Sequence, residues 1–591
     1  MSSPLDLGFD PDALRAKYRT ERDRRIRPDG STQYRPASNY ADDPHVDPDF
    51  TREPLHDTVD AVVVGGGFGG LLAAARLRQV GVERIRVIDK AGDFGGTWYW
   101  NRYPGIHCDI ESYVYMPLLE ELGYVPAWKY APGEEIRQHA QAIGRHFDLY
   151  REACFQTGVT DLSWDEDALV WLVATDRADQ IRARYVVVSN GTLDRPKLPG
   201  IPGIETFRGH TFHTSRWDYD YTGGDADGGL DRLADKRVAL IGTGATAIQV
   251  VPHLGRDAQQ LYVFQRTPST VDVRGNRRTD PEWAASLTPG WQRRRRENFL
   301  NIVAGGPAES EDLVSDGWTS SAHMLHNLTP VEVRDSLSEE ERSRLDEIAD
   351  FQKMNEIRGR VTDIVRDPAT AALLEPWYRY MCKRPTFSDE YLQTFNRPNV
   401  TLVDTADHGG VDRITSGGIV VGDREYEVDC VIFATGFSVG MSDVLTGQLP
   451  VHGRDGTLMS HWGSGPRTLH GFYSDGFPNL FFMGGLQNAP AVNFVHILDE
   501  QAVHIAEVVG EAEKRGARWV EPSTSAVDRW QTALGENAEA LYKFHAECTP
   551  GYYNNEGQPR MRAGYGKGAV TFHGVLRDWR ENGGMDEVMA G

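Results

Sequence analysis

The sequence predicts an α/β protein made of two dinucleotide-binding, Rossmann-like domains of three layers each, together with a helical insertion. Two Gly-rich turns support this prediction, because each follows an apolar run and precedes a helix-like stretch. The first turn spans 65–70 after the apolar run 61–64, and the second spans 242–247 after the run 238–241. Backbone N–H groups and a helix N-terminus can hold a pyrophosphate in this setting.

The two turns differ in the residue that is expected to contact the ribose of a bound nucleotide. Asp89 follows Gly70 by nineteen residues, and Arg266 follows Ala247 by nineteen residues. A carboxylate accepts hydrogen bonds from ribose hydroxyls, whereas a guanidinium suits a 2′-phosphate. We therefore expect a nucleotide with a free ribose in the first unit, NADP in the second, and electron transfer between the two. An isolated glycine cluster often marks an ordinary turn, but two with equally spaced ribose readers make that alternative weak.

Composition limits the class of protein. The 591 residues are enough for two or three domains, and the net charge of −23 argues against a broad nucleic-acid or anionic-membrane surface. The five cysteines are far apart and contain no C-x-x-C, so we expect neither a zinc site nor a disulfide framework, as in a reducing cytoplasm. No apolar run approaches the length of a membrane span. The sequence predicts a soluble cytoplasmic protein.

The N-terminal extension, residues 1–56, is polar and is expected to be a surface segment that wraps the core or is partly disordered, and the alternative is a role in covering the substrate entrance. Within it, Asp10 as N-cap and Pro11 at the first turn predict a helix over 11–25. Further along, the apolar runs 168–174 and 181–188 predict a β-meander.

Residues 276–380 have Glu- and Arg-rich helical patterns, such as 332–350, and are expected to form a helical insertion. The run Arg293–Arg296 within it is interpreted as a solvated helix face rather than a ligand clamp. Strands are predicted near 398–404, 417–435 and 480–483, and a helix over 502–513. The segment 429–436 is a strand that enters a small-residue turn, and we interpret it as the return of the chain to the first domain.

An aromatic segment, 95–109, lies between the first turn and the meander. Its tryptophans and tyrosines could form the wall of a flat ring system, and the alternative is ordinary aromatic core packing. Asp109 ends this segment, and a buried carboxylate there needs a cation or hydrogen-bond donors.

Before the second turn, residues 207–218 read F-R-G-H-T-F-H-T-S-R-W-D. This pattern, Phe-x-Gly-x-x-x-His-x-x-x-Trp-Asp, resembles the fingerprint of the Baeyer–Villiger monooxygenases. The pattern Gly-Gly-x-Trp…Tyr-Pro-Gly-x-x-x-Asp in 95–109 resembles their second signature, and the likeness extends from about 57 to near 551. The long N-terminal extension is similar to that of the subgroup that oxidises bulky ketones, such as the pentalenolactone-pathway and polycyclic ketone monooxygenases.

The resemblance implies how the chain is divided. An FAD-binding domain would take 57–199 and 429–591 with the C-terminal tail, and an NADP-binding domain would take 200–275 and 381–428. The resemblance and the two fingerprints together give these cofactor-binding residues: Gly65, Gly67, Phe68, Gly70, Asp89, Lys90, Gly96, Thr97, Trp98, Tyr103, Asp109, Tyr115, Val159, Gly242, Thr243, Gly244, Ala245, Thr246, Ala247, Gln249, Arg266, Thr267 and Lys383. No metal ligand is predicted.

By the same resemblance, Arg384 is the active-site arginine and Asp109 the carboxylate that positions it. Lys383 is implied to contact the 2′-phosphate of NADP beside Arg266 and Thr267. His213 is implied to link the domains rather than to act as a base. Tyr552, Tyr553 and Asn554 are candidates to close over the cofactors, and the alternative for them is a plain surface turn.

The implied reaction uses NADPH to reduce FAD, and the reduced flavin forms a C4a-peroxide with O2 that attacks a ketone and yields an ester or lactone. The substrate would be a bulky cyclic or polycyclic ketone, terpenoid or steroid-like, with the insertion 276–380 and loop 485–493 as pocket walls. The chain would act as a monomer or small homo-oligomer. Alternatives are an N- or S-hydroxylating flavin monooxygenase, a disulfide reductase, for which Cys108 lacks a near partner in sequence, and a non-catalytic redox-binding flavoprotein.

Overall fold

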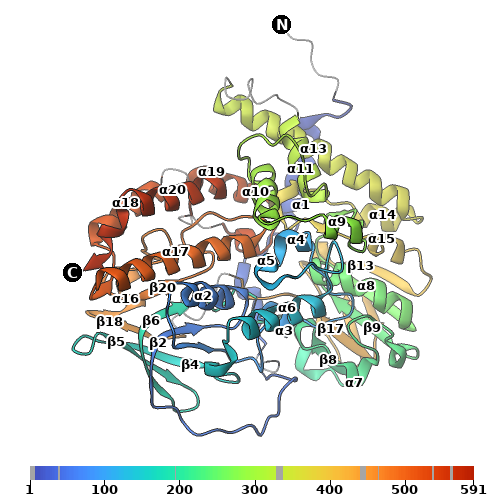
Figure 1. Cartoon of the computed structure of the whole chain (residues 1–591). Helices are drawn as coiled ribbons and strands as arrows, with labels where there is room; N and C mark the ends of the chain where they lie inside the picture. The colour runs from blue at the N-terminus through green and yellow to red at the C-terminus, as the bar shows by residue number, and fades with distance from the viewer. Residues whose placement is uncertain are drawn as a thin grey trace.

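The computed structural model contains two main sheets side by side, with the helices of the insertion above them (Figure 1). It describes residues 7–37, 40, 42–193, 195–327, 337–439, 448–463, 465–535, 538–559 and 564–590. Each sheet carries one of the two Gly-rich turns at the end of a central parallel strand. The predicted α/β fold with two Rossmann-like units is confirmed.

The first sheet has eight strands in the order β19-β18-β4-β5-β6-β2-β3, with β20 paired to β6. β2 pairs in parallel with β3 and β6, whereas β4, β5 and β6 form the predicted antiparallel meander. The strands are β2 (Thr58–Val64), β3 (Ile85–Ile88), β4 (Val159–Asp165), β5 (Val170–Thr175), β6 (Gln180–Val188), β18 (Val451–Gly453), β19 (Gly456–Thr457) and β20 (Leu480–Phe482).

Both faces of β2 are buried, which explains why its sequence is an unbroken apolar run. Ala61 and Val63 belong to the large core that includes α2 (Phe68–Gln79) and α17 (Phe494–Arg515), whereas Val62 and Val64 belong to a second core on the opposite face. The helix predicted over 502–513 is α17, which begins eight residues earlier than expected.

The second sheet has five parallel strands in the order β13-β10-β9-β17-β8. The strands are β8 (His210–His213), β9 (Arg237–Ile241), β10 (Gln260–Gln265), β13 (Val400–Asp404) and β17 (Cys430–Phe433). Helix α8 (Ala245–Asp257) shares a core with one face, and the small antiparallel sheet of β14 (Arg413–Ile414), β15 (Gly418–Val421) and β16 (Arg424–Glu427) shares a core with the other.

One predicted boundary is wrong. The strand at 430–433 was assigned to the first domain, but it lies between β9 and β8 in the second sheet, with Val431 opposite Ala239. The chain therefore returns to the first domain only after 433. The sequence pattern could not decide this, because an apolar strand fits the interior of either sheet.

The insertion is helical, as predicted. It contains α9 (Pro281–Ala285), α10 (Trp291–Val303), α11 (Gly317–Asn327), α13 (Glu339–Ile364) and α14 (Pro368–Leu374). Residues 332–336 of the predicted pattern lie outside the described residues, and α13 starts with a capping box formed by Ser338 and Glu341.

The interpretation of the arginine run on α10 is half wrong. Arg293 and Arg294 are exposed, but Arg295 donates two hydrogen bonds to the buried Glu111, at 2.6 and 2.7 Å. Arg296 is buried and pairs with Asp499 of α17 at 2.8 Å. Two of the four arginines therefore fix the insertion to the first domain rather than face solvent.

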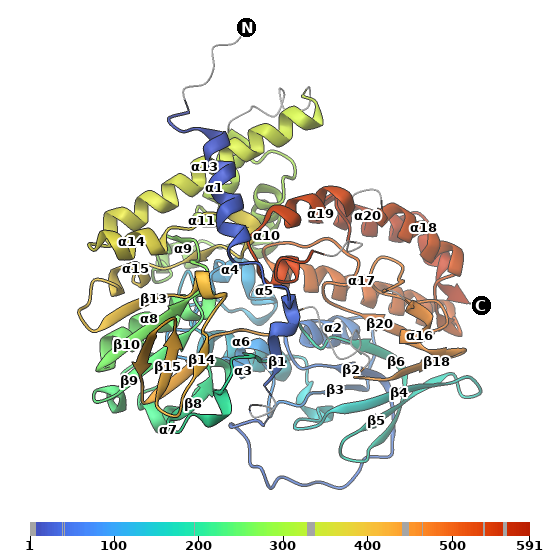
Figure 2. The ribbon, with the colours of Figure 1, turned by 180° about the vertical axis from the view of Figure 1, so that it is seen from behind.

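Helix α1 (Pro11–Asp23) forms where predicted, and the Asp10 side chain accepts hydrogen bonds from the N–H groups of residues 12 and 13. In Figure 2 this helix crosses α13, and the chain then descends between the two sheets to β1 (Tyr34–Pro36), which pairs with β7 (Lys197–Pro199). The N-terminal extension therefore lies along the junction of the two units.

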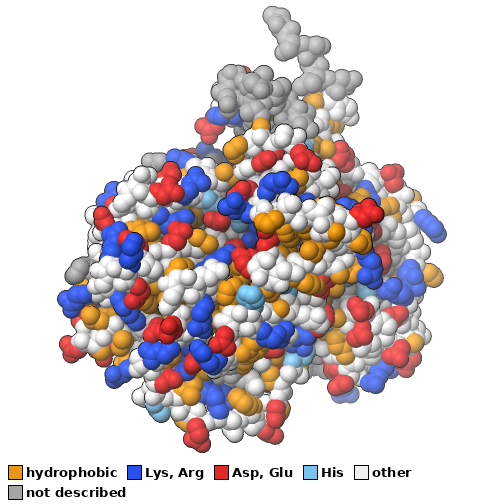
Figure 3. Space-filling view, viewed as in Figure 1, with side chains coloured by type: hydrophobic (Ala, Val, Ile, Leu, Met, Phe, Trp, Pro, Cys, Tyr) orange, Lys and Arg blue, Asp and Glu red, His pale blue; other side chains and the backbone are white. Residues whose placement is uncertain are grey.

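The C-terminal helices α18 (Thr524–Gly535), α19 (Ala538–Glu547) and α20 (Ala569–Glu581) extend beside α17. None of the described helices has the length and apolar character of a membrane span. Acidic and basic side chains are intermixed on the face seen in Figure 3, without a continuous basic patch.

Candidate active site

A cavity of about 1250 Å³ lies between the two units and is lined by both Gly-rich turns. Of the residues predicted to be catalytic or to bind a cofactor, all but Gly70 and Ala247 line it. Those two act instead in helix packing: a Cβ on Gly70 would lie 1.8 Å from the Gly65 carbonyl oxygen, and Ala247 is fully buried. The structure thus brings the predicted site residues together in one space.

The two turns have nearly the same geometry. Gly65 and Gly242 have φ values of +111° and +113°. A Cβ on Gly65 would lie 2.3 Å from the Ser189 carbonyl oxygen, and one on Gly242 would lie 2.5 Å from the Ala434 carbonyl oxygen. Glycine is therefore required at both positions, and the open backbone leaves room for a phosphate group.

Asp89, the residue predicted to contact a ribose at the first turn, is held by backbone groups. The Asp89 carboxylate accepts hydrogen bonds from the N–H of Gly66 and, at 2.8 Å, from the N–H of Ala91. Asp89 lies at the end of β3 and lines the cavity. This placement fits an adenosine ribose next to a pyrophosphate that rests on the N-terminus of α2.

The aromatic segment forms a wall beside the first turn. Trp98 donates to the Tyr115 hydroxyl at 2.9 Å, and Phe68 contacts Tyr115 edge-on with ring centroids 6.1 Å apart. A Cβ on Gly96 would lie 2.6 Å from Gly67 Cα, so the aromatic segment and the turn are in close contact. Burial raises the pKa of the Tyr103 hydroxyl to about 12, so this phenol stays neutral even in mildly alkaline solution. The space fits a flat, largely apolar ring system.

Arg384 and Asp109 are joined by two hydrogen bonds. Arg384 Nη2 lies 2.6 Å from Asp109 Oδ1, and Arg384 Nε lies 3.1 Å from Asp109 Oδ2. Burial alone lowers the pKa of the guanidinium, but the Asp109 carboxylate outweighs burial and raises it. Trp318 of the insertion packs over the guanidinium at 5.4 Å and donates to the Asp109 carbonyl oxygen at 2.9 Å. Arg384 is therefore a fixed cation at the cavity surface.

Near the second turn, Arg266 and Lys383 lie in a partly buried group of charges that includes two residues absent from the prediction, Lys197 and Glu556. Arg266 Nη2 donates to Glu556 Oε2 at 2.7 Å, and Lys197 Nζ lies 3.9 Å from Glu556 Oε1. Burial and the nearby Arg266 lower the pKa of Lys383 to about 8. Gln33 of the N-terminal extension accepts from Arg266 Nη1 at 2.7 Å, so this extension helps to build the site.

The residues of the fingerprint segment 207–218 pack in the core and cap a helix. His213 is fully buried at the end of β8, and burial lowers its pKa to about 3, so the imidazole is neutral. Its ring contacts Phe437 edge-on at 5.8 Å. Asp218 caps α7 (Tyr219–Thr222) and accepts from His210 Nε2 at 2.8 Å, while Trp217 packs on Phe212. His213 thus has no access to a reacting group, as the resemblance implied.

The expectation of no disulfide is wrong. Cys382 and Cys548 form a disulfide that links residues 166 positions apart. Their spacing contains no local signal, because the fold alone brings the two thiols together. The bond ties the segment with Lys383 and Arg384 to the C-terminal segment that follows α19.

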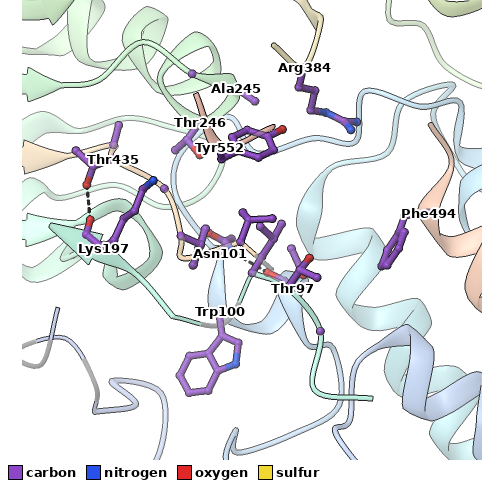
Figure 4. A pocket seen from close by; sticks show the side chains of 18 of the residues that line it. Thr97, Trp100, Asn101, Lys197, Ala245, Thr246, Arg384, Thr435, Phe494 and Tyr552 are labelled. Carbon is purple, nitrogen blue, oxygen red and sulfur yellow. Dashed lines mark hydrogen bonds between the residues drawn. The ribbon is translucent and has the colours of Figure 1, made fainter. Parts of the chain in front are cut away.

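Beyond the disulfide, Tyr552 and Tyr553 line the cavity, as expected for residues that cover it. Figure 4 shows the Tyr552 ring beside Thr246, with Arg384 projecting from a separate segment. Asn554 does not share this role: its side chain accepts from the N–H groups of Gly551 and Gly557 and donates to the Cys548 carbonyl oxygen at 3.0 Å. Asn554 therefore fixes the conformation of the segment.

The expected pocket walls are partly corrected. The cavity lining includes Gly485, Leu486, Pro490, Ala491 and Val492 of the predicted loop, but no described residue of 276–380. Among the described residues of the insertion, Trp318 contacts the Arg384–Asp109 pair from behind the cavity wall. Gln33, Lys197 and Glu556 were missed because each lies far in sequence from both turns and carries no motif.

Two histidines and a glutamate whose spacing could hold a metal ion lie outside the cavity. The possible ligand atoms of His496, Glu500 and His573 lie within 4.8 Å of one another, and none of the three residues lines the cavity.

Comparisons with known proteins agree with this geometry. Residues 63–122 match the NAD(P)-binding Rossmann-like domain family. The chain is 59% identical over 586 residues to a Baeyer-Villiger monooxygenase of Streptomyces coelicolor, covering 98% of this chain and 96% of the relative. It is 53% identical over 584 residues to the pentalenolactone D synthase of Streptomyces exfoliatus, covering 97% and 99%. A solved polycyclic ketone monooxygenase from the thermophilic fungus Thermothelomyces thermophila superimposes with a TM-score of 0.89 at 40% identity, covering 98% of each chain.

Proposed function

Because the chain belongs to the Baeyer–Villiger monooxygenase family, we propose that it inserts one oxygen atom of O2 beside the carbonyl of a bulky cyclic or polycyclic ketone, with FAD and NADPH. NADPH supplies a hydride, which amounts to two electrons and one proton, and the solvent supplies the second proton of the water. One oxygen atom enters the ester or lactone, and the other leaves as water. Ketone, O2, NADPH and H⁺ are thus converted to ester, NADP⁺ and H2O.

The observation that supports this proposal most strongly is the paired Arg384 and Asp109 in a cavity shared by two nucleotide turns. A guanidinium stays protonated, so it stabilises negative oxygen without giving up a proton. Arg384 would face the negative charge that develops on the carbonyl oxygen when the ketone is attacked. Asp109 would hold the guanidinium in place, so that little reorganisation is needed during the reaction.

FAD would lie on the first turn, with its pyrophosphate at the N-terminus of α2, its adenosine ribose at Asp89 and its ring system against Trp98 and Tyr115. Bound there, FAD supplies the redox and oxygen chemistry, whereas the protein supplies orientation and charge. Gly65 and Gly67 leave the backbone open to the phosphates, which is the fit that the glycine geometry supports.

NADPH would lie on the second turn, with its 2′-phosphate toward Arg266 and Lys383. A bound nicotinamide nucleotide, together with Tyr552 and Tyr553, would also restrict water at the reacting centre, which limits loss of the oxidant as peroxide. The identity of Arg266 at the ribose-reading position favours NADPH over NADH.

The test is turnover of a ketone panel that includes fused-ring terpenoids and steroid-like ketones. We expect NADPH consumption to rise with a ketone and the product mass to increase by one oxygen atom, with ¹⁸O2 labelling the ester once. Oxidation of a matched amine or sulfide with no ester from any ketone would favour the N- or S-hydroxylating alternative. NADPH consumption that no ketone stimulates would contradict the proposal.

The substrate size is supported by the names of the relatives, among them a pentalenolactone D synthase and a polycyclic ketone monooxygenase. A cytoplasmic location and a monomeric or small homo-oligomeric state stay predictions from the sequence.

A further inference from the structure

The carboxylate of Glu556 is the anion at the centre of the charged group near the second turn. Its side chain is 5% exposed, and its two oxygens face different cations: Oε2 lies 2.7 Å from Arg266 Nη2, and Oε1 lies 3.9 Å from Lys197 Nζ. Burial raises the pKa of Glu556, but Arg266 and Lys197 outweigh burial and lower it. Glu556 is therefore ionised in this position.

The charges of this group do not balance. Arg266, Lys197 and Lys383 bring three basic groups to one carboxylate, and all of them line the same cavity. Burying cations is costly unless anions compensate them, and a single carboxylate compensates only one charge. A phosphate monoester carries about 1.5 to 2 negative charges at neutral pH. Three basic groups beside one carboxylate leave positive charge in excess, and a phosphate would compensate it.

Glu556 reaches the group from a short segment with an unusual backbone. Asn555 and Glu556 have φ values of +51° and +58°, a region that non-glycine residues rarely adopt. The Glu556 N–H donates to the Gly551 carbonyl oxygen at 2.8 Å, which closes a compact loop. The same loop carries Tyr552 and Tyr553 to the cavity. Movement of Glu556 is thus linked to the position of both tyrosines.

We propose that Glu556 occupies the subsite of the coenzyme 2′-phosphate before NADPH binds, and that the 2′-phosphate displaces it together with the segment 551–557. Both terminal nitrogens of the Arg266 guanidinium already have partners, Gln33 on Nη1 and Glu556 on Nη2, so a phosphate gains a paired contact with this guanidinium only when Glu556 leaves. NADH lacks the 2′-phosphate and has nothing to exchange with Glu556. The segment 551–557 therefore distinguishes the two coenzymes and transmits the difference to Tyr552 and Tyr553.

The disulfide limits this displacement. Cys548 is anchored to Cys382, and only residues 549–550 separate it from the segment. The segment can leave the charged group but stays beside the cavity. Exchange of the two anions thus opens the subsite without releasing the C-terminal tail.

The first experiment compares coenzyme affinity in Glu556→Gln and wild type. The glutamine keeps the size of the side chain and removes its charge, so NADP⁺ no longer competes with a carboxylate. We expect the Kd of NADP⁺ to fall by about fivefold or more, the range of ordinary coupling energies, and the Kd of NAD⁺ to stay within twofold. The matched control is Glu547→Gln, an exposed residue on α19, which should leave both values unchanged.

The second experiment uses the wild-type holoenzyme, so it does not depend on the folding of a variant. Hydrogen exchange is followed in peptides that cover 551–557, with adenosine 2′,5′-bisphosphate or 5′-AMP as the probe. We expect faster exchange with the 2′-phosphorylated probe and no change with 5′-AMP.

Unchanged or weaker NADP⁺ binding in Glu556→Gln, or equal tightening for NAD⁺, would overturn the proposal, as would identical exchange with both probes. The inference rests on the assignment of NADPH to the second turn, and the two can fail separately. Wild-type protein without measurable NADP⁺ binding rejects that assignment and the inference together. Tight NADP⁺ binding that ignores Glu556 rejects the inference alone.

Discussion

Cys382 and Cys548 are joined in a disulfide, and the first of them lies two residues before Arg384. The bond therefore connects the segment of Arg384 to the segment that carries Tyr552, Tyr553 and Glu556. Two parts of the cavity wall that are distant in sequence are held together by a covalent link whose formation depends on redox conditions.

Replacing Cys548 by serine should lower the stability of the protein. Closing a loop of 166 residues restricts the unfolded chain, and the chain-entropy estimate is an upper limit of about 5 kcal/mol. We expect a lower Tm in Cys548→Ser than in the oxidised wild type. Dithiothreitol should lower the Tm of the wild type and have no effect on the variant. Equal Tm values for the variant and the oxidised wild type would show that the disulfide does not form in solution.

Replacing Arg384 by alanine should stop ester formation while leaving flavin reduction intact. Hydride transfer from NADPH does not need the guanidinium, whereas attack on the ketone loses the donor that faces the negative oxygen. Loss of one such donor costs about 3 to 4 kcal/mol of barrier, or roughly 10²- to 10³-fold in rate. Anaerobic flavin bleaching and product mass analysis separate the two steps.

Arg384→Lys provides the matched comparison. It keeps a positive charge but lacks the two-pronged contact with Asp109, so we expect an intermediate rate. Ester output near the wild-type level in Arg384→Ala would refute the role given to this residue.

Local sequence signals predicted those parts of the structure that depend on neighbouring residues. The Asp10 cap starts α1, and the Gly65 and Gly242 turns lie where an apolar run meets a helix, because each feature is specified within a few positions. Asp89 and Arg266 were predicted as ribose-binding residues from their fixed distance to these turns, and both line the cavity. For Asp109 and Arg384 the signal came from the family resemblance rather than from spacing.

Features that depend on tertiary packing were not predictable in this way. The partners of Cys382 and Glu556 are determined by the meeting of distant segments, and no periodicity encodes such a meeting. Arg295 and Arg296 look like a solvated charge run until the fold places Glu111 and Asp499 beside them. The apolar pattern of the strand at 430–433 suits the interior of either sheet. Only its pairing with β9 and β8 shows that it belongs to the second sheet.

Replacing Arg266 by alanine should raise the KM for NADPH far more than the KM for NADH. Arg266 is the residue that follows the second turn at the ribose-binding position. Of the groups of the coenzyme, its guanidinium would contact only the 2′-phosphate, so its loss affects the phosphorylated coenzyme selectively. Initial rates with each coenzyme at saturating ketone measure the effect. An equal increase in both KM values would refute the 2′-phosphate assignment.

The affinity for NADP⁺ should fall as the pH rises above about 8. In the unliganded protein, burial and Arg266 lower the pKa of Lys383 to about 8, so the lysine is charged below that pH and neutral above it. A bound 2′-phosphate favours the charged lysine and raises its pKa. Above pH 8, binding must therefore take up a proton, and each further pH unit should weaken the affinity by up to about tenfold.

Titrations of NADP⁺ and NAD⁺ between about pH 7.5 and 9.5 measure this slope, because the second pKa of a phosphate monoester is about 6 and its ionisation is nearly complete in that range. NAD⁺ serves as the control and should show little slope, since it offers no phosphate to Lys383. Lys383→Arg stays protonated across the range and should bind NADP⁺ with nearly constant affinity. A slope that persists unchanged in Lys383→Arg would assign the proton uptake to another group.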